Sequence, residues 1–188
     1  MWPFAKKAEG AHEGREEKFA DARAARAELL WKQGNRYLFQ KRYDKAIESM
    51  EAAYELEPSR LEGRLNFGAA LYLAGRPADA LGHLRYVLAL DPQNTAGLLN
   101  LSAVYDALGE YEESIATLEK LVADRPNWAD AHYNLAVAYY KRAHDDKAAE
   151  ALKAELRLNP KHEAARTLLN EIHLKIRRKP EPSADTPG

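Results

Sequence analysis

The sequence repeats one pattern of apolar and polar positions four times, with 34 residues in each copy. A proline falls at the same place in every copy, at Pro58, Pro92, Pro126 and Pro160. In this register the copies span residues 27–60, 61–94, 95–128 and 129–162. A constant period of this length is typical of a repeat array, in which each unit completes its core against its neighbours.

Each copy contains two apolar stripes with the 3.6-residue spacing of an α-helix. Small residues recur at position 8 of the copies, as Gly34, Gly68, Ser102 and Ala136. They recur again at position 20, as Ala46, Ala80, Ser114 and Ala148. Small residues in register indicate that the two helices cross closely. We therefore expect a helix, a short turn and a second helix that ends before the proline of each copy.

Both ends of the array require a cover, because a terminal repeat leaves an apolar face without a neighbour. Residues 163–179 carry apolar side chains at helical spacing and are predicted to form a C-terminal capping helix. Residues 15–26 predict an N-terminal helix, which either continues into the first repeat or packs separately. Residues 1–14 and 180–188 are predicted to be disordered tails.

Two features of the flanks allow two interpretations each. The predicted capping helix ends with cations between Lys175 and Lys179. We interpret them as cations that favour a helix C-terminus, with a basic patch for acidic lipid or nucleic acid as the alternative. Near the N-terminus, Trp2 and Phe4 precede two lysines, which makes a weak peripheral contact with a membrane, or insertion into a partner's pocket, a hypothesis.

Composition excludes several classes of protein. The 188 residues include 28 Lys and Arg against 29 Asp and Glu, so the formal net charge of −1 argues against binding nucleic acid. Cysteine is absent, which excludes disulfides and thiolate metal sites. The apolar runs are too short for a membrane-spanning helix and no secretory signal precedes the array. We therefore expect a cytoplasmic protein without integral membrane association.

The sequence contains no recognisable catalytic or metal-binding motif. No two of its six histidines are three or four residues apart, and no phosphate-binding loop or nucleophile motif occurs. The acidic pair Asp145 and Asp146 beside His144 is interpreted as a solvated turn. The prediction is a protein that is not an enzyme, with no catalytic residues, no metal site and no cofactor.

The 34-residue period, the small residues at positions 8 and 20 and the proline at position 32 resemble the tetratricopeptide repeat. The resemblance covers residues 27–162 and implies an all-α fold, a right-handed solenoid of antiparallel helix pairs with N- and C-terminal capping helices. The sequence departs from the family pattern at position 4, where Arg64 and His132 occur. The fourth turn also lacks the usual glycine and has Ala143 instead, so we expect it to be looser.

The first helix of each copy is apolar on a second side, which on an ordinary amphipathic helix would be polar. In the tetratricopeptide family this side is the concave groove, which commonly receives a peptide or a partner helix. The alternative is that these side chains pack between neighbouring first helices or under the terminal helices. The predicted partner-binding groove comprises Trp31, Lys32, Asn35, Phe39, Leu65, Asn66, Tyr72, Leu99, Asn100, Tyr133, Asn134 and Tyr140.

Position 6 of the copies forms a polar column in this groove, with Lys32 followed by Asn66, Asn100 and Asn134. An asparagine amide both donates and accepts, so a row of them is suited to the backbone of an extended peptide. The column resembles the asparagine ladder in the repeats of the O-linked N-acetylglucosamine transferases, whose catalytic domain this chain lacks. The alternative is that these residues only cap or solvate their helices.

A second family function is excluded residue by residue. Tetratricopeptide proteins that clamp the acidic C-terminal tails of heat-shock chaperones use two asparagines together with lysine and arginine. Asn35 and Asn66 match that clamp, but Trp31, Ala96 and Asn100 occupy the positions of its cations. Without those cations the groove has no charge with which to hold a carboxylate.

The sequence therefore predicts a non-enzymatic protein–protein interaction module, an adaptor, scaffold or chaperone-like protein, whose groove binds a peptide or helix of another protein. One alternative is a structural scaffold, a homo-oligomer that assembles through the N-terminal segment. A further alternative is a secretion-type chaperone.

Overall fold

The computed structural model describes residues 3–128 and 130–178, and for residues 3–16 and 178 only the backbone. Every regular element in these residues is an α-helix. The first four are α1 (Pro3–Phe39), α2 (Tyr43–Leu56), α3 (Leu61–Leu73) and α4 (Pro77–Leu90). The others are α5 (Thr95–Leu108), α6 (Tyr111–Asp124), α7 (Ala131–Lys141), α8 (Asp145–Leu158) and α9 (Glu163–Arg178).

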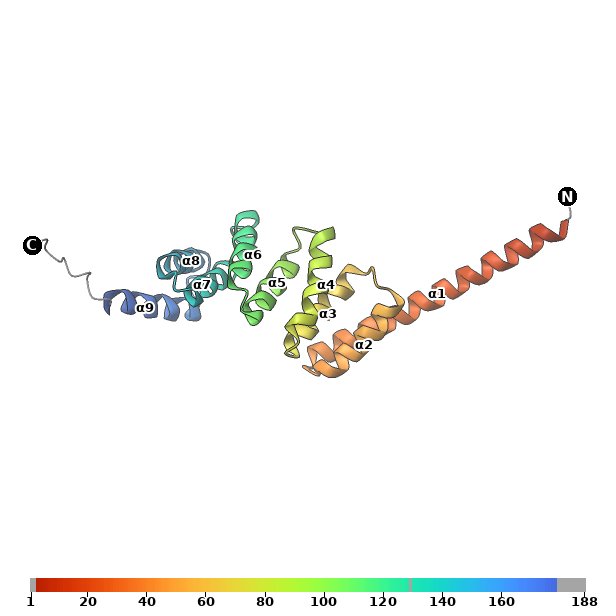
Figure 1. Ribbon diagram of the computed structural model, residues 1–188, viewed down its shortest axis with the longest axis horizontal. Helices are drawn as coiled ribbons and strands as arrows, with labels where there is room; N and C mark the ends of the chain where they lie inside the picture. Colours follow the sequence, from red (N-terminus) through yellow and green to blue (C-terminus); the bar gives the residue numbers. More distant parts are fainter. Residues whose placement is uncertain (1–2, 129, 179–188) are drawn as a thin grey trace, which may run out of the picture. The chain divides into compact units, whose positions relative to one another are not determined.

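The helices form two compact units, residues 1–92 and 93–188, which we call the N-unit and the C-unit. In the N-unit, α1 packs on α2, α3 packs on α4, and α2 also contacts α3 (Figure 1). In the C-unit, α5 packs on α6, α7 packs on α8, and α6 contacts α7 as α8 contacts α9. Each unit thus contains two antiparallel helix pairs, which confirms the predicted all-α, tetratricopeptide-type fold.

The small residues at position 8 allow the two helices of a pair to touch. A Cβ atom added to Gly34 would lie 2.5 Å from Cγ of Met50, and one added to Gly68 would lie 2.9 Å from Cγ of Leu84. In the third pair, the hydroxyl of Ser114 donates a hydrogen bond of 3.0 Å to the carbonyl of Ser102. The predicted close crossing is confirmed, and a larger side chain at position 8 would force the helices apart.

All four turns within the pairs place one residue in the left-handed region of backbone conformation. Gly75 and Gly109 have φ of 78°, and Lys41 and Ala143 have φ of 57° at the equivalent position. The fourth turn, which was expected to be looser, has the same kind of left-handed residue as the others, because Ala143 adopts the conformation that glycine provides at positions 75 and 109. A residue with a Cβ atom adopts this conformation at a cost in free energy.

The unusual residues at position 4 bind the end of the preceding helix pair. The guanidinium of Arg64 donates to the carbonyl of Pro58, and the ring of His132 contacts the carbonyl of Pro126 at 2.7 Å. Arg166 of α9, at the equivalent position, donates to the carbonyl of Pro160. These side chains satisfy carbonyls that follow a helix C-terminus, where no intrahelical donor is available.

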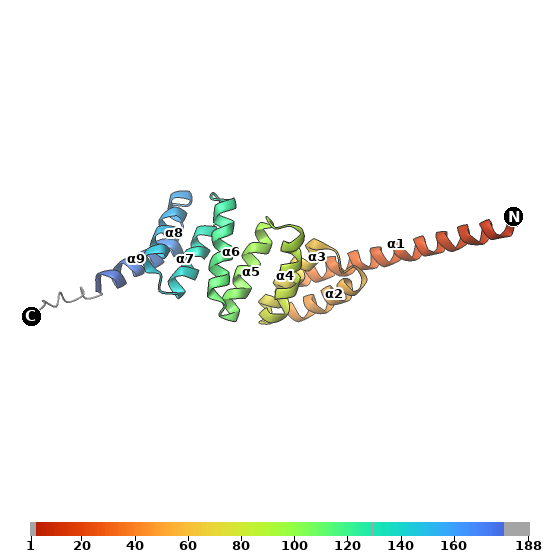
Figure 2. The ribbon, with the colours of Figure 1, turned by 45° about the horizontal axis from the view of Figure 1, so that its top comes forward.

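The first helix is longer than the sequence predicted. It runs without interruption from Pro3, so the N-terminal helix is continuous with the first repeat helix and includes residues 3–14, for which the sequence analysis predicted a disordered tail. Proline suits the first turn of a helix, and the Ala, Glu and Lys residues that follow favour helix. The N-terminal part of α1 extends beyond the end of α2 (Figures 1 and 2). Trp2 and residues 179–188, which include the predicted C-terminal tail, lie outside the described residues.

Helix α9 packs on α8 in the C-unit. Its residues Ala165 and Ile172 are fully buried. The ammonium of Lys175 bonds to Oδ1 of Asp145 at 2.8 Å and lies 4.9 Å from the ring centre of Tyr140. This bond raises the pKa of Lys175. Asp145 is buried, which corrects its interpretation as part of a solvated turn, and Lys175 serves to fix α9 rather than to form a free basic patch.

Candidate partner-binding surface

An apolar pocket of about 710 Å³ opens in the N-unit, between the C-terminal ends of α1 and α3 and the start of α2. Its lining includes three residues of the predicted groove, Asn35, Phe39 and Asn66. Phe39 is 90% exposed, and Leu73, which also lines the pocket, is 49% exposed. The pocket is lined by Asn35, Leu38, Phe39, Lys41, Tyr43, Asn66 and Leu73.

Phe39 and Leu73 are exposed because the repeat places them outside the core of their helix pairs. Each is the last residue of its helix, at the same position in the first and second copies. The equivalent residues of the third and fourth copies are Ala107 and Lys141. A large apolar side chain at this position is therefore confined to the N-unit, which distinguishes this pocket from the rest of the predicted groove.

The amides of Asn35 and Asn66 are joined by a hydrogen bond in the wall of the pocket. Nδ2 of Asn66 donates to Oδ1 of Asn35 over 3.1 Å, and both residues are partly buried. Each amide has two donor hydrogens and an oxygen with two lone pairs. The bond between them therefore orients both side chains and leaves donors and acceptors for a ligand.

Trp31 does not line the pocket, which corrects its place in the predicted groove. It is only 2% exposed, and its indole ring packs against Gly63 at the start of α3. A Cβ atom at Gly63 would lie 2.6 Å from the ring. Trp31, at position 5 of the first copy, thus packs between the first helices of two neighbouring copies, α1 and α3. This is the alternative that the sequence analysis gave for the groove side chains. The next residues in this column, Leu65 and Leu99, are partly buried.

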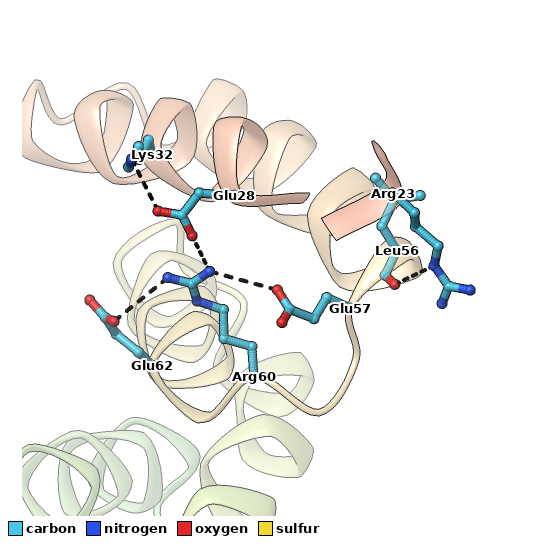
Figure 3. A network of polar contacts seen from close by, with 7 residues as sticks. All are labelled: Arg23, Glu28, Lys32, Leu56, Glu57, Arg60 and Glu62. Atoms are coloured by element: carbon cyan, nitrogen blue, oxygen red, sulfur yellow. Dashed lines mark hydrogen bonds and ion pairs between the residues drawn. The ribbon is translucent and has the colours of Figure 1, made fainter. Parts of the chain in front are cut away.

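Lys32 is exposed and belongs to a network of ion pairs rather than to the pocket (Figure 3). It bonds to Glu28 at 3.1 Å, and Glu28 also bonds to Arg60, which lowers the pKa of the Glu28 carboxyl. Arg60 approaches Glu57 and Glu62 as well, at 3.6 and 3.9 Å. The network links α1 to the α2–α3 connection, a structural role that differs from the predicted contact with a partner.

The aromatic groove residues of the C-unit are engaged by the segment that contains α9. The ring of Tyr133 lies 4.7 Å from that of His162, which immediately precedes α9. The hydroxyl of Tyr140 donates to Glu171 of α9 at 2.5 Å, which raises the pKa of that hydroxyl. These two residues again follow the alternative interpretation, in which groove side chains pack under a terminal helix.

The remaining groove residues form no continuous ladder in the described structure. Tyr72, Asn100 and Asn134 are partly buried. Among the position-6 asparagines, the only side-chain to side-chain bond found within the described residues is that of Asn66, whose partner Asn35 is at position 9 of the preceding copy. Of the asparagine column predicted from the sequence, the pocket therefore contains Asn66, paired with Asn35.

Four residues of the pocket were absent from the predicted groove. Leu38 and Leu73 lie on first helices, whereas Lys41 and Tyr43 lie outside them. Lys41 occupies the left-handed turn after α1, and Tyr43 begins α2. The rim beside them is basic: the guanidinium carbon of Arg42 lies 4.9 Å from the ring centre of Tyr37, and the ammonium of Lys45 lies 6.0 Å from it. The position of Lys41 in the turn was visible in the repeat register, but not its contribution to a pocket.

None of the helices in the described residues combines the length and the hydropathy that crossing a membrane requires. Three matches to the tetratricopeptide repeat family fall on residues 31–95, 71–132 and 130–162. Together they run from Trp31, near the C-terminal end of α1, to His162, the residue before α9. They include the residues that line the N-unit pocket and every helix from α2 to α8.

The chain is similar in sequence to longer proteins. It is 31% identical over 125 residues to an Hsp70-Hsp90 organizing protein of Triticum aestivum, a match covering 64% of this chain and 22% of that protein. It is 32% identical over 87 residues to a probable UDP-N-acetylglucosamine–peptide N-acetylglucosaminyltransferase of Arabidopsis thaliana, covering 46% and 9%. The chain thus spans less than a quarter of the length of these relatives.

Solved structures share the fold. MamA from Desulfovibrio magneticus RS-1 superposes with a TM-score of 0.74 at 24% identity, covering 81% of this chain and 86% of that one. A thermophilic TPR protein of Thermus thermophilus gives a TM-score of 0.66 at 24% identity, covering 80% and 82%. At 24% sequence identity, these superpositions show a shared fold and nothing about function. With the repeat register, the helix pairs and the three family matches in agreement, the chain belongs to the tetratricopeptide repeat family.

Proposed function

We propose that this chain is a protein–protein interaction module whose N-unit pocket binds a short extended segment of another protein. The observation that supports this most directly is the exposure of Phe39 and Leu73 at the mouth of a pocket of about 710 Å³. Apolar side chains that gather at one concave place on a surface are typical of a binding site. An apolar side chain of the partner would enter between them.

The amide pair favours an extended segment over a helix. Asn35 and Asn66 keep free donors and acceptors after their mutual bond. An extended backbone offers unpaired N–H and C=O groups to such amides, whereas a helix has already used most of its own. The apolar residue would supply affinity and the amides would fix the direction of the chain.

The basic rim favours an acidic residue next to the apolar one. Lys41, Arg42 and Lys45 are exposed beside the pocket, with Asp44 as the acidic residue among them. Opposite charges across an interface raise the association rate and discriminate against wrong partners more than they increase affinity. This rim differs from the carboxylate clamp, because Trp31, at a position where the clamp has a cation, is buried.

The proposal is tested by exchanging the apolar walls for carboxylates. Phe39→Asp and Leu73→Asp should each reduce capture of the wild-type chain's partner by at least about tenfold, the scale of an interface anchor. Leu174→Asp is the matched control, because Leu174 is an exposed leucine of α9 outside the pocket. Unchanged helical circular dichroism would show that the variants fold. Equal capture by all three variants would refute the assignment of this pocket.

A second candidate, self-association, rests on the exposed part of α1. The N-terminal part of this helix passes beyond α2 (Figure 2). Phe19, within this helix, is 71% exposed. We propose as the alternative that this segment of one copy binds another copy. Removing residues 1–20, while keeping Arg23 and its bond to the Leu56 carbonyl, should convert an oligomer to a monomer by light scattering. A monomer with and without these residues would exclude the alternative.

No catalytic role is proposed, and the cytoplasm remains the proposed location. The transferase among the relatives is far longer than this chain, and the match covers 9% of it. Its activity is therefore not carried over to the repeats.

A further inference from the structure

Three side chains that commonly bind metal ions meet in the C-unit, where the ends of three helices converge. Asp130 precedes α7, Glu155 lies in the last turn of α8, and His162 precedes α9. One potential ligand atom of each lies within 4.8 Å of those of the other two. The three residues come from separate parts of the repeat array and include only one histidine, so no pair of closely spaced histidines marks them in the sequence.

Glu155 is the most informative member of this cluster. Its side chain is fully buried, and neither carboxylate oxygen has a hydrogen-bond partner within the described part of the chain. A buried carboxylate without a hydrogen bond or a counter-ion is strongly disfavoured. Its position beside two further ligand groups therefore points to a missing cation rather than to a purely structural role.

The protein groups around Glu155 do not supply that cation. Within the cluster, Nε2 of the His162 ring is 3.1 Å from Oδ1 of Asp130, a hydrogen bond that becomes an ion pair only when the histidine is protonated. Among the described residues, no lysine or arginine binds either carboxylate oxygen of Glu155. With a neutral histidine the cluster carries two negative charges, which one divalent cation would balance.

The histidine is held in place from two sides. Its ring stacks on Tyr133 at 4.7 Å, with 35° between the planes. Its Nδ1 accepts a hydrogen bond of 3.1 Å from the amide of Ala165, in the first turn of α9. This leaves Nε2 as the nitrogen that faces Asp130. The side chain of Asp130 is 62% exposed, so an ion would have access to the cluster from solvent.

We propose that Asp130, Glu155 and His162 bind one divalent transition-metal ion, with Zn²⁺ as the reference case. One carboxylate oxygen from each acidic residue and Nε2 of His162 provide three ligands, and water completes a tetrahedral site. An imidazole with two carboxylates suits Zn²⁺ or Co²⁺ better than Mg²⁺ or Ca²⁺, which prefer oxygen ligands alone.

Binding through Nε2 has a consequence for α9. The proton on Nε2 is displaced by the metal, and a neutral ring then carries its proton on Nδ1. Nδ1 can no longer accept from the amide of Ala165, so that hydrogen bond is lost. The ion would join the start of α7, the end of α8 and the start of α9, and its binding would be detectable at the first turn of the cap.

The test uses the full-length chain without a histidine tag, stripped with a chelator and titrated with Zn²⁺ by calorimetry. We expect one equivalent to bind, with a shift of the Ala165 amide resonance and a rise in melting temperature. Glu155→Gln should weaken binding by at least about tenfold. Asp130→Asn should do the same, and it provides a second variant at an exposed position should the first fold poorly.

Two neighbours outside the cluster serve as controls. Glu163→Gln changes an exposed carboxylate next to His162, and His173→Ala removes an exposed histidine of α9. Both should bind Zn²⁺ as the wild type does. Absence of stoichiometric binding would overturn the proposal, as would full affinity in Glu155→Gln or an equal loss in the two controls.

Discussion

The indole ring of Trp31 packs directly on the backbone of Gly63, which leaves no room for a Cβ atom. Such an atom would lie 2.6 Å from ring carbons Cε2 and Cζ2. Trp31 is fully enclosed and has no space into which to move. The contact fixes α1 against α3, and these two helices carry the walls of the N-unit pocket.

Gly63→Ala should therefore destabilise the protein. We expect a loss of about 1–3 kcal/mol in the free energy of unfolding, the usual cost of overpacking, measured by urea denaturation. In a Trp31→Leu background the same change should cost much less, because the clash is removed. Gly82→Ala is the control: its Cβ atom would meet nothing within 4 Å, and alanine in a helix should stabilise by about 0.5–1 kcal/mol. Equal effects at positions 63 and 82 would contradict this packing.

At the left-handed turns, exchanging alanine for glycine should stabilise the protein. Ala143→Gly should raise the free energy of unfolding by about 1 kcal/mol, because φ of 57° is strained for alanine. Gly109→Ala should lower it by about the same amount, because its Cβ atom would meet no neighbour and only the backbone conformation is penalised. Urea unfolding midpoints measure both changes. A destabilised Ala143→Gly variant would show that the fourth turn has a different conformation.

His83 makes stability depend on pH. Its ring lies between Tyr54 and Phe67, at 5.1 and 4.5 Å, and burial followed by the charge of Arg64 lowers its pKa below the usual 6.5. The unfolded state therefore binds the proton first as the pH falls. The free energy of unfolding should therefore be highest above about pH 7. It should decline toward pH 5, as the histidine of the unfolded state is protonated.

Urea denaturation of the wild type and of His83→Gln at pH 5 and pH 8 measures this effect. The variant should show a smaller difference between the two pH values than the wild type. His144→Gln, which changes an exposed histidine, should keep the wild-type difference. Identical pH dependence in wild type and His83→Gln would exclude His83 as the source.

The sequence predicted the helix pairs well because their periodicity is a local property. The 34-residue register also identified Gly34 and Gly68 at the close crossings, since small residues recurred in one column. The bond from Arg64 to the Pro58 carbonyl was not foreseen, although both residues occupy regular positions, because a side chain that reaches backward leaves no periodic signal.

The candidate surface was predicted only in part. Asn35, Phe39 and Asn66, which were predicted as groove residues, line one pocket of the N-unit. Trp31 was not, because a helical wheel gives the direction of a side chain but not whether Gly63 opposite it leaves space for the ring. Tyr133 and Tyr140 were assigned to an open groove, although the segment of α9 engages both. Burial of this kind depends on helices distant in sequence.

The central claim, that the N-unit pocket receives an extended segment of a partner, is tested most directly by photocrosslinking in cells. A photoreactive residue at Phe39 should attach to one partner, and mass spectrometry should map the attachment to a single short stretch with an apolar and an acidic residue. The same group at Leu174, which is exposed on α9, should not give this product. Attachment from Leu174 as efficient as that from Phe39, or no defined product from Phe39, would contradict the account.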